Sequence, residues 1–229
     1  MRVKVDVDVD APSLRWEDVH GPARGVAYEL IGSQDAALGR VLHDEGWGGS
    51  PLKPVGLTSP QFKGAPRKAG VYTTSRDGAI WFGSPVPRIA SVLIAALAAR
   101  QELQWGEATL RIRGINIDVP PPVAGGEVEL VTATPVVIKH ESRYLLPEDR
   151  LFLDRLQHNL DRKADLLELP APQDLQVMDS GPRRRFTVRG APRIGAVVRL
   201  RMTADARFVE AIRSWGLGLD TVQGFGWIR

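Results

Sequence analysis

Apolar and polar residues alternate at the start of the chain. Valine stands at positions 3, 5, 7 and 9, with Lys4, Asp6 and Asp8 between them. A period of two is typical of a strand that buries one face and exposes the other. The pattern therefore predicts a first β-strand here.

Helical spacing follows the first strand. Residues 23–31 read as a helix, Gly32 weakens it, and Ser33 can cap a second helix that ends at Gly46. We therefore expect a broken helical pair. The remaining elements expected in the first half are strands at 52–58, 70–74 and 79–82, a helix at 89–99 and a strand at 109–119.

A segment rich in proline and glycine separates two similar halves. The prolines at 120–122 and the pair Gly125-Gly126 favour extended chain without regular hydrogen bonding. The elements expected beyond it are strands at 127–138, 183–188, 194–202 and 224–228, with helices at 148–167 and 204–215. The repeated order predicts an α+β chain of two tandem ferredoxin-like domains, residues 1–120 and 121–229.

Composition narrows the classes of function. The 229 residues carry a formal charge of +3, with arginines clustered at 183–185 and at 189–201, which suits a polyanionic partner. Cysteine is absent, which excludes disulfides, thiolate zinc sites and cysteine nucleophiles and suits the cytoplasm. No apolar run approaches the roughly 20 residues of a membrane span, and the N-terminal residues do not resemble a signal peptide, so neither membrane association nor export is expected.

Four glycines lie in the run 216–226, namely Gly216, Gly218, Gly224 and Gly226. Glycine lets backbone amides approach a phosphate closely. The run is neither a dinucleotide fingerprint, because Thr221 occupies the third glycine position, nor a P-loop, because no lysine follows. On spacing alone, a tight turn between a helix and a strand is the better interpretation.

Four segments together resemble a known family. GLGLDTVQGFGWI at 216–228 is similar to the carboxy-terminal glycine-rich loop of the RAMP superfamily. The segments AYELIGSQDAALGRVLHDEGW, TATPVVI and YLLPEDRLFLDRLQHNLDRK resemble, in the expected order, its repeat-processing CRISPR endoribonucleases. Val222 departs from the pattern, since that family often has serine there. The resemblance implies two ferredoxin-like domains that bind CRISPR repeat RNA and cut it once per repeat without metal, which yields guide RNAs.

His43 is the first candidate catalytic residue. When a ribose 2′-OH attacks the adjacent phosphate, the protein must supply a base, an acid and positive charge, but no nucleophile. The negative helix end and the two carboxylates of Asp44 and Glu45 favour the imidazolium, which suits an acid. The resemblance matches His43 to the active-site histidine of the LHDEG segment. The alternative is an ordinary surface histidine.

Tyr28 and Lys53 complete the candidate site. The resemblance matches Tyr28 to a tyrosine that can act as the base, although a continuous helix would place it about 22 Å from His43. The two can share a phosphate only if the chain turns back around Gly32 and Ser33. Lys53 can stabilise the charge of the phosphorane. Ordinary packing of Tyr28 and solvation of Lys53 are the alternatives.

The candidate RNA-binding residues lie in the second half. Arg183, Arg185 and Arg189 can form a stripe on one strand face, for which a solvated sheet face is the alternative. Lys139 and Arg143 flank His140 beyond another strand and can contact phosphate. The glycines at 216, 218, 224 and 226 complete the set. His20 lies in an expected loop and receives no role.

These observations favour a metal-independent endoribonuclease that leaves 2′,3′-cyclic phosphate and 5′-hydroxyl ends. No cofactor and no metal site is expected, since no histidines have the spacing of a metal site. The expected partner is CRISPR repeat RNA, with membership of an effector ribonucleoprotein and a homodimer left open. A non-catalytic RAMP subunit that binds guide RNA is the main alternative, and a nucleotide-binding regulatory protein explains the glycine-rich run less well.

Overall fold

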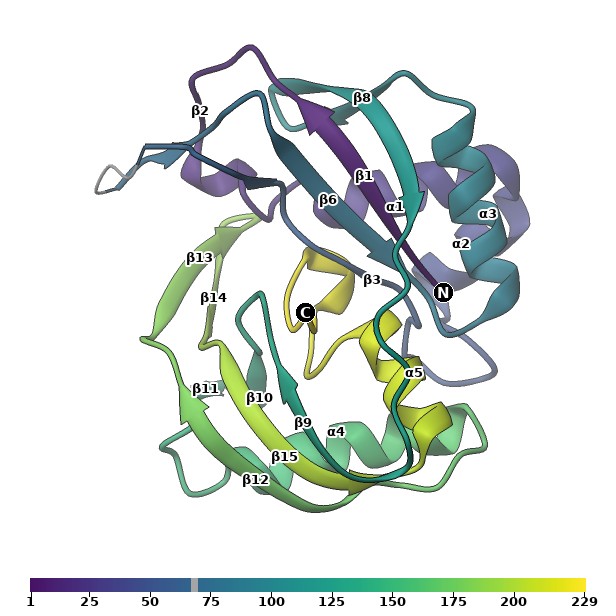
Figure 1. Cartoon of the computed structure of the whole chain (residues 1–229), viewed down its shortest axis with the longest axis vertical. Coiled ribbons are helices and arrows are strands. Elements are labelled where there is room, and N and C mark those ends of the chain that lie inside the picture. The colour runs from purple at the N-terminus through teal and green to yellow at the C-terminus, as the bar shows by residue number, and fades with distance from the viewer. Residues whose placement is uncertain (67–69) are drawn as a thin grey trace.

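The computed structural model describes residues 1–66 and 70–229. The elements form two halves that lie side by side, with the C-terminal segment between them (Figure 1). Within the described residues, every helix is too short or too polar to cross a bilayer.

The first half is a sheet covered by helices on one face. Strand β1 (Arg2–Asp8) pairs with β6 (Gly78–Gly83) and with β8 (Ala108–Ile117), and the order β3-β6-β1-β8-β7 is antiparallel throughout. The predicted valine alternation is confirmed, because all four valines are buried. The other elements are β2 (Ser13–Leu14), β3 (Gly56–Leu57), β4 (Gln61–Phe62), β5 (Tyr72–Thr73), β7 (Glu102–Trp105), the 3-10 helix η1 (Trp16–Asp18), α1 (Ala23–Gln34), α2 (Ala36–Asp44) and α3 (Pro87–Ala98).

The predicted broken helical pair is confirmed, with a different cap. Helix α1 runs to Gln34, and Asp35 caps α2 by accepting a hydrogen bond from the Leu38 amide at 2.9 Å. Ser33, the expected cap, instead donates to the Leu30 carbonyl inside α1 at 2.8 Å. Asp and Ser are both good N-caps, so composition alone did not separate them.

The second half repeats the arrangement. Its sheet has the order β12-β15-β9 and is antiparallel. The elements are β9 (Gly126–Val131), β10 (Ile138–His140), β11 (Arg143–Leu145), α4 (Phe152–Leu166), β12 (Gln173–Ser180), β13 (Arg184–Val188), β14 (Ala191–Gly195), β15 (Val198–Ala204), α5 (Ala206–Trp215) and the 3-10 helix η2 (Thr221–Gln223). Together the halves confirm the tandem ferredoxin-like fold expected from the sequence.

Several strands of the second half differ from expectation. The strand expected at 127–138 is two strands, β9 and β10, and the one expected at 194–202 is also two, β14 and β15. Strands β11 and β12 were not anticipated; in β12 the apolar alternation is confined to Leu175 and Val177, which are only partly buried. The strand expected at 224–228 is reduced to a single bridge between Ile228 and Thr132. The expected boundary after residue 120 lies in a segment without helix or strand, between the end of β8 and the start of β9.

The segment after α5 joins the two halves. Arg2, on the first strand, donates from Nη1 to the carbonyl of Ile228 at 3.0 Å and from Nε to Asp118 at 2.8 Å. Its guanidinium carbon lies 4.6 Å from the centre of the Trp227 ring. A buried arginine from the first half therefore holds the end of the second.

His20 also belongs to this junction, although the sequence analysis left it unassigned in a loop. Its ring is 2% exposed and stacks on Phe225 with ring centres 4.1 Å apart. Since a carbonyl can only accept, His20 Nδ1 donates to the Gln223 carbonyl at 2.9 Å. Burial lowers the pKa of His20 to about 4, and the hydrogen bond to Gln223 opposes this in part.

His20 makes the stability of the junction depend on pH. Its folded pKa of about 4 lies below the 6.5 of a solvated imidazole, so the unfolded chain binds more protons between these pH values. His20 should therefore make its full contribution to the free energy of unfolding above pH 6.5. That contribution, about 3 kcal/mol, should be lost as the pH falls towards 4. Urea unfolding of the wild type and of His20→Phe across this range measures the effect. Equal pH slopes in the two proteins would contradict it.

Candidate active site

Tyr28 and His43 meet where α1 and α2 pack together. Their ring centres are 5.2 Å apart in an edge-to-face arrangement, with an interplanar angle of 73°. The Tyr28 hydroxyl lies 3.5 Å from the carbonyl of Leu42. The turn at Asp35 therefore brings together two residues that a continuous helix would hold far apart.

The absence of a side chain at Gly39 permits this close packing against Gly32 of the neighbouring helix. A Cβ on Gly39 would lie 3.0 Å from the Cα of Gly32, a contact that would push the helices apart. Tyr28 stands four residues before Gly32, and His43 four residues after Gly39, so each ring lies about one turn from the glycine contact. The glycine contact therefore sets the spacing of the two rings.

Lys53 reaches the same place from the loop after α2. Its ammonium donates a hydrogen bond to the His43 carbonyl and lies 5.6 Å from the centre of the Tyr28 ring. The Lys53 carbonyl in turn accepts a hydrogen bond from Trp215 Nε1 of the second half at 2.9 Å. The structure thus places all three predicted catalytic residues together.

Arg24 is a neighbour that the sequence analysis missed. Its guanidinium carbon lies 6.0 Å from the centre of the Tyr28 ring. Arg24 is four residues before Tyr28 on α1, a spacing that places two side chains on one helix face. That spacing was the signal available in the sequence.

The electrostatics of the site differ from residue to residue. Burial raises the pKa of Tyr28 to about 12, with nearby Arg24 acting against the shift. Burial lowers the pKa of Lys53, and the charge of Arg24 adds to that effect. His43 is half exposed and donates from Nδ1 to the Asp44 carboxylate at 2.7 Å, which leaves Nε2 for another partner. The arrangement offers a proton donor beside two cations.

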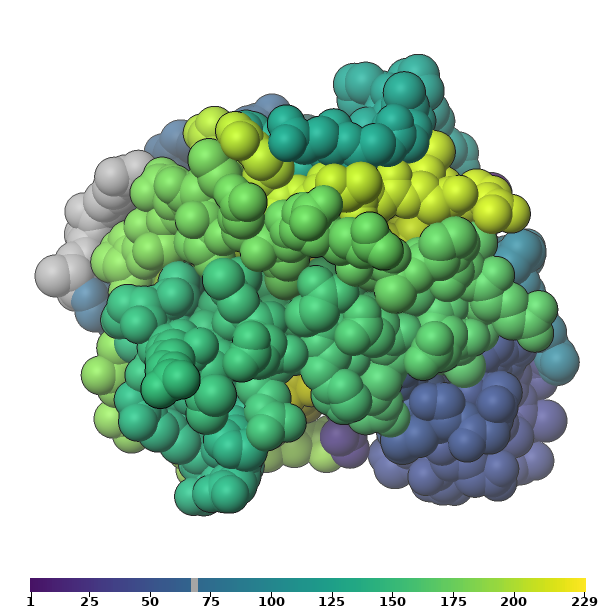
Figure 2. All heavy atoms as spheres, turned by 90° about the horizontal axis from the view of Figure 1, so that it is seen from below, coloured from purple at the N-terminus to yellow at the C-terminus, as the bar shows by residue number. Residues whose placement is uncertain are grey.

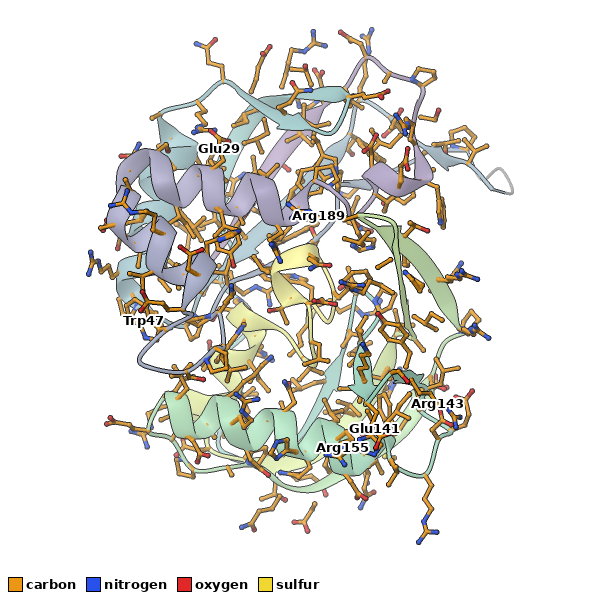
Figure 3. The ribbon with its side chains drawn as sticks, turned by 180° about the vertical axis from the view of Figure 1, so that it is seen from behind. Glu29, Trp47, Glu141, Arg143, Arg155 and Arg189 are labelled. Atoms are coloured by element: carbon orange, nitrogen blue, oxygen red, sulfur yellow. The ribbon has the colours of Figure 1, made fainter. Side chains whose placement is uncertain are left out.

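An open cavity of about 300 Å³ lies over the helix pair. Figure 3 shows α1 and α2 side by side, with Trp47 at the start of the loop that follows α2. The cavity is lined by Tyr28, Gly32, Ala36, Gly39, Arg40, His43 and Asp44. A ligand can therefore reach His43 from solvent.

The glycine-rich segment does not have the exposure expected of a phosphate-binding loop. Gly216, Gly218, Gly224 and Gly226 are all buried. The amides of Gly216, Gly224 and Gly226 already donate to the carbonyls of Ile212, Thr221 and Pro135. Their missing side chains allow close contacts within the protein, since a Cβ on Gly226 would lie 1.9 Å from the Leu217 carbonyl oxygen. In this structure the segment is a tight connection between the halves.

Val222, the departure from the family pattern, is part of that connection. Its side chain is 7% exposed and packs with the hydrophobic core of the first half. The neighbouring Thr221 hydroxyl donates to the Val55 carbonyl at 2.9 Å. A hydroxyl contact to the first half is thus supplied by the residue before Val222.

The predicted arginine stripe lies on an exposed hairpin. Phe186 and Val188 of β13 are buried towards the first half, and Arg183, Arg185 and Arg189 are exposed. Figure 3 places Arg189 at the end of the hairpin nearest the first half. The exposure and alternation leave these side chains available to a polyanion.

Lys139 and Arg143 form a separate group. Lys139 is exposed, and its ammonium lies 5.8 Å from the centre of the Tyr144 ring. Arg143 is paired with Asp149. In Figure 3, Arg143 lies at the opposite end of the second half from Arg189, so the structure does not combine the two groups into one patch.

Comparisons with known proteins agree on one family. Residues 119–229 match the model of the family CRISPR associated protein Cas6, C-terminal. A Cas6-related protein from Pyrococcus furiosus has a TM-score of 0.84 at 18% identity, over 100% of this chain and 97% of that chain. No curated protein matches the sequence.

Two further solved structures share the fold. A RAMP protein described as binding different RNA substrates has a TM-score of 0.82 at 21% identity, over 100% of this chain and 98% of that chain. The product complex of a Cas6 from Thermus thermophilus has a TM-score of 0.64 at 16% identity, over 99% and 98%. Residues 119–229 therefore match the Cas6 C-terminal family model, and the whole chain has the tandem ferredoxin-like fold of these Cas6 and RAMP structures, as its sequence resemblance indicated.

Proposed function

We propose that this chain is an endoribonuclease that binds CRISPR repeat RNA and cleaves precursor transcripts into guide RNAs. Tyr28 and His43 line one open cavity, and the Lys53 ammonium reaches both of them from beside it. This convergence carries the proposal. The Cas6 structures of the same fold include a substrate mimic complex and product complexes, which supports RNA as the ligand class.

In the proposed reaction the ribose 2′-oxygen attacks the adjacent phosphorus, and the bond to the 5′-oxygen breaks. His43 donates a proton from Nε2 to the departing 5′-oxygen, while its Nδ1 stays bound to Asp44. Lys53 and Arg24 stabilise the negative charge that develops on the phosphorane. The products then carry a 2′,3′-cyclic phosphate and a 5′-hydroxyl, and the 2′-OH proton passes to water.

Tyr28 takes a different role from the base suggested by the resemblance. With a pKa of about 12, its hydroxyl is protonated at neutral pH. A protonated phenol is a poor base and a good hydrogen-bond donor. We therefore assign Tyr28 to hold a phosphate oxygen, and Tyr28→Phe should slow cleavage less than loss of His43.

The nucleophile proposed here belongs to the substrate, which makes the mechanism directly testable. A single 2′-deoxy nucleotide just upstream of the scissile phosphate should block cleavage while the RNA still binds. Chelator should leave the rate unchanged, because the chain's own side chains supply the acid and the charge. Gel analysis of fragment ends measures both. Cleavage of the deoxy substrate at the same bond, or activity lost in chelator and restored by magnesium, would contradict the mechanism.

His43→Ala is the matching protein variant. It should lower the cleavage rate by about 10²- to 10⁴-fold, the usual contribution of a general acid. Repeat RNA affinity should stay within a few-fold, since proton transfer acts on the transition state. A wild type that binds repeat RNA without cutting it would instead favour a non-catalytic RAMP subunit of an effector ribonucleoprotein.

The glycine contact between α1 and α2 provides a second prediction. Gly39→Val should force Tyr28 and His43 apart and lower the cleavage rate at saturating RNA by up to about 100-fold, as small displacements of reacting groups do. Gly32→Ala is the control, because a Cβ there would have nothing within 4 Å. Single-turnover assays measure the rates, and contacts between the two rings in NMR spectra measure the separation. Equal rates in both variants would rule out the spacing argument.

The arginine stripe predicts how binding responds to salt. Replacing both Arg183 and Arg185 with alanine should weaken RNA binding and lower the slope of log affinity against log salt by about one unit for each lost phosphate contact. Arg207→Ala is the control, since Arg207 is exposed on α5 and paired with Asp205. An unaltered slope in the double variant would show that the stripe is a solvated sheet face.

A further inference from the structure

A second cavity, of about 280 Å³, lies between the halves, and we propose that it holds one nucleotide of the bound RNA beside the scissile phosphate. This inference rests on the proposed function. The cavity is bounded by α1, by the loop at 51–53, by α4 and by the segment after α5. Its volume is close to the lower end of ligand sites, roughly 300 Å³, which suits one nucleotide.

The cavity shares its wall with the candidate active site. Lys53 lines it, and the same ammonium donates to the His43 carbonyl. Arg24 also lines it and lies beside the Tyr28 ring. A strand whose phosphate lies over His43 therefore passes Lys53 and Arg24 before its next residue reaches this cavity.

Two buried amides in the cavity wall have unpaired acceptors. Asn159 is 8% exposed and Gln223 6% exposed, and within the described residues Asn159 Oδ1 and Gln223 Oε1 have no hydrogen-bond partner. Buried polar atoms are nearly always paired in folded proteins, so two unpaired oxygens on residues of one cavity wall point to a missing ligand. Primary amides carry both donors and acceptors and recognise the edges of nucleobases.

The charge of the cavity favours a nucleotide over an apolar group. Lys163 is 1% exposed and donates to the carbonyls of Gly216 at 2.6 Å and Gly218 at 3.3 Å. Burial lowers the pKa of Lys163 to about 7, so its ammonium is only partly charged at neutral pH, and the full positive charges of the wall belong to Arg24 and Lys53. The one acid in the wall, Asp220, is paired with Arg193 at 2.6 Å. An anionic ligand with a polar base matches this lining.

Comparison of abasic RNAs in wild type and variants tests the inference. Uncleavable repeat RNA, carrying a 2′-deoxy nucleotide at the cleavage site, would have one base removed at each position within two nucleotides of the scissile phosphate. In the wild type, removal at one position should weaken binding about tenfold or more. In Asn159→Leu with Gln223→Leu, removal at that same position should change affinity less than about twofold, because the amides that read the base are already gone.

The control variant is His158→Ala, which removes an exposed side chain next to Asn159 on α4. It should keep the full abasic effect. Each single variant, Asn159→Leu and Gln223→Leu, should show a partial effect, and its thermal unfolding should confirm that it folds. An equal loss in wild type and double variant, or no loss at any position, would overturn the nucleotide site and leave an empty polar cavity or a free anion.

The outcomes separate this inference from the proposed function. Binding of the uncleavable RNA tests the nucleotide site in the second cavity, whereas cleavage of the ordinary RNA tests the proposed endoribonuclease activity. If the wild type shows the abasic effect but never cuts RNA, the nucleotide site stands and the proposed endoribonuclease activity is wrong. If the wild type cuts RNA but shows no abasic effect, the activity stands and the nucleotide site is wrong.

Discussion

The fold depends on a contact in which backbone meets backbone with no side chain between. The last turn of α5 packs on the edge of the first sheet, where a Cβ on Gly56 would lie 2.4 Å from the Trp215 carbonyl oxygen. A Cβ on Gly83 would lie 2.5 Å from the Ser214 carbonyl oxygen. Any other residue at these two positions would force the halves apart. The candidate active site inherits this constraint, because the Trp215 indole holds the Lys53 carbonyl.

Glycine therefore has two structural roles in this chain, and both concern distance. At the helix pair, the missing Cβ of Gly39 lets α2 lie against the backbone of Gly32, which sets the separation of Tyr28 and His43. At the junction, the glycines after α5 let the chain turn sharply while its amides are paired inside the protein. In this structure the glycine-rich run at 216–226 serves to pack the two halves together. This role also explains why buried hydrophobic residues lie between its glycines.

Hydrophobic periodicity and capping residues predicted most helices and strands, but they could not predict which residues make contacts between the two halves. The valine alternation and the break after α1 follow from periodicity and capping. The family resemblance supplied Tyr28 and His43, and Lys53 was proposed for its charge and its position after the glycine pair at 48–49. His20 gave no such signal, because its partner Phe225 is about two hundred residues away along the chain. Asn159 and Lys163 likewise look like ordinary residues of an amphipathic helix until the segment after α5 packs above them. Strand β12 was missed because only Leu175 and Val177 alternate in it and the rest of the strand is polar or exposed.

The burial of Val222 in the core of the first half has a consequence for how the protein is made. The ribosome releases the first sheet and its helices roughly a hundred residues before the segment that completes their core, and domains generally fold as units from the N-terminus. Until that segment arrives, Val19 and the ring of His20 lack their partner Phe225 and remain exposed to water. The nascent first half is thus an incomplete folding unit, and its hydrophobic core is completed only when the C-terminal segment of the second half has been synthesised.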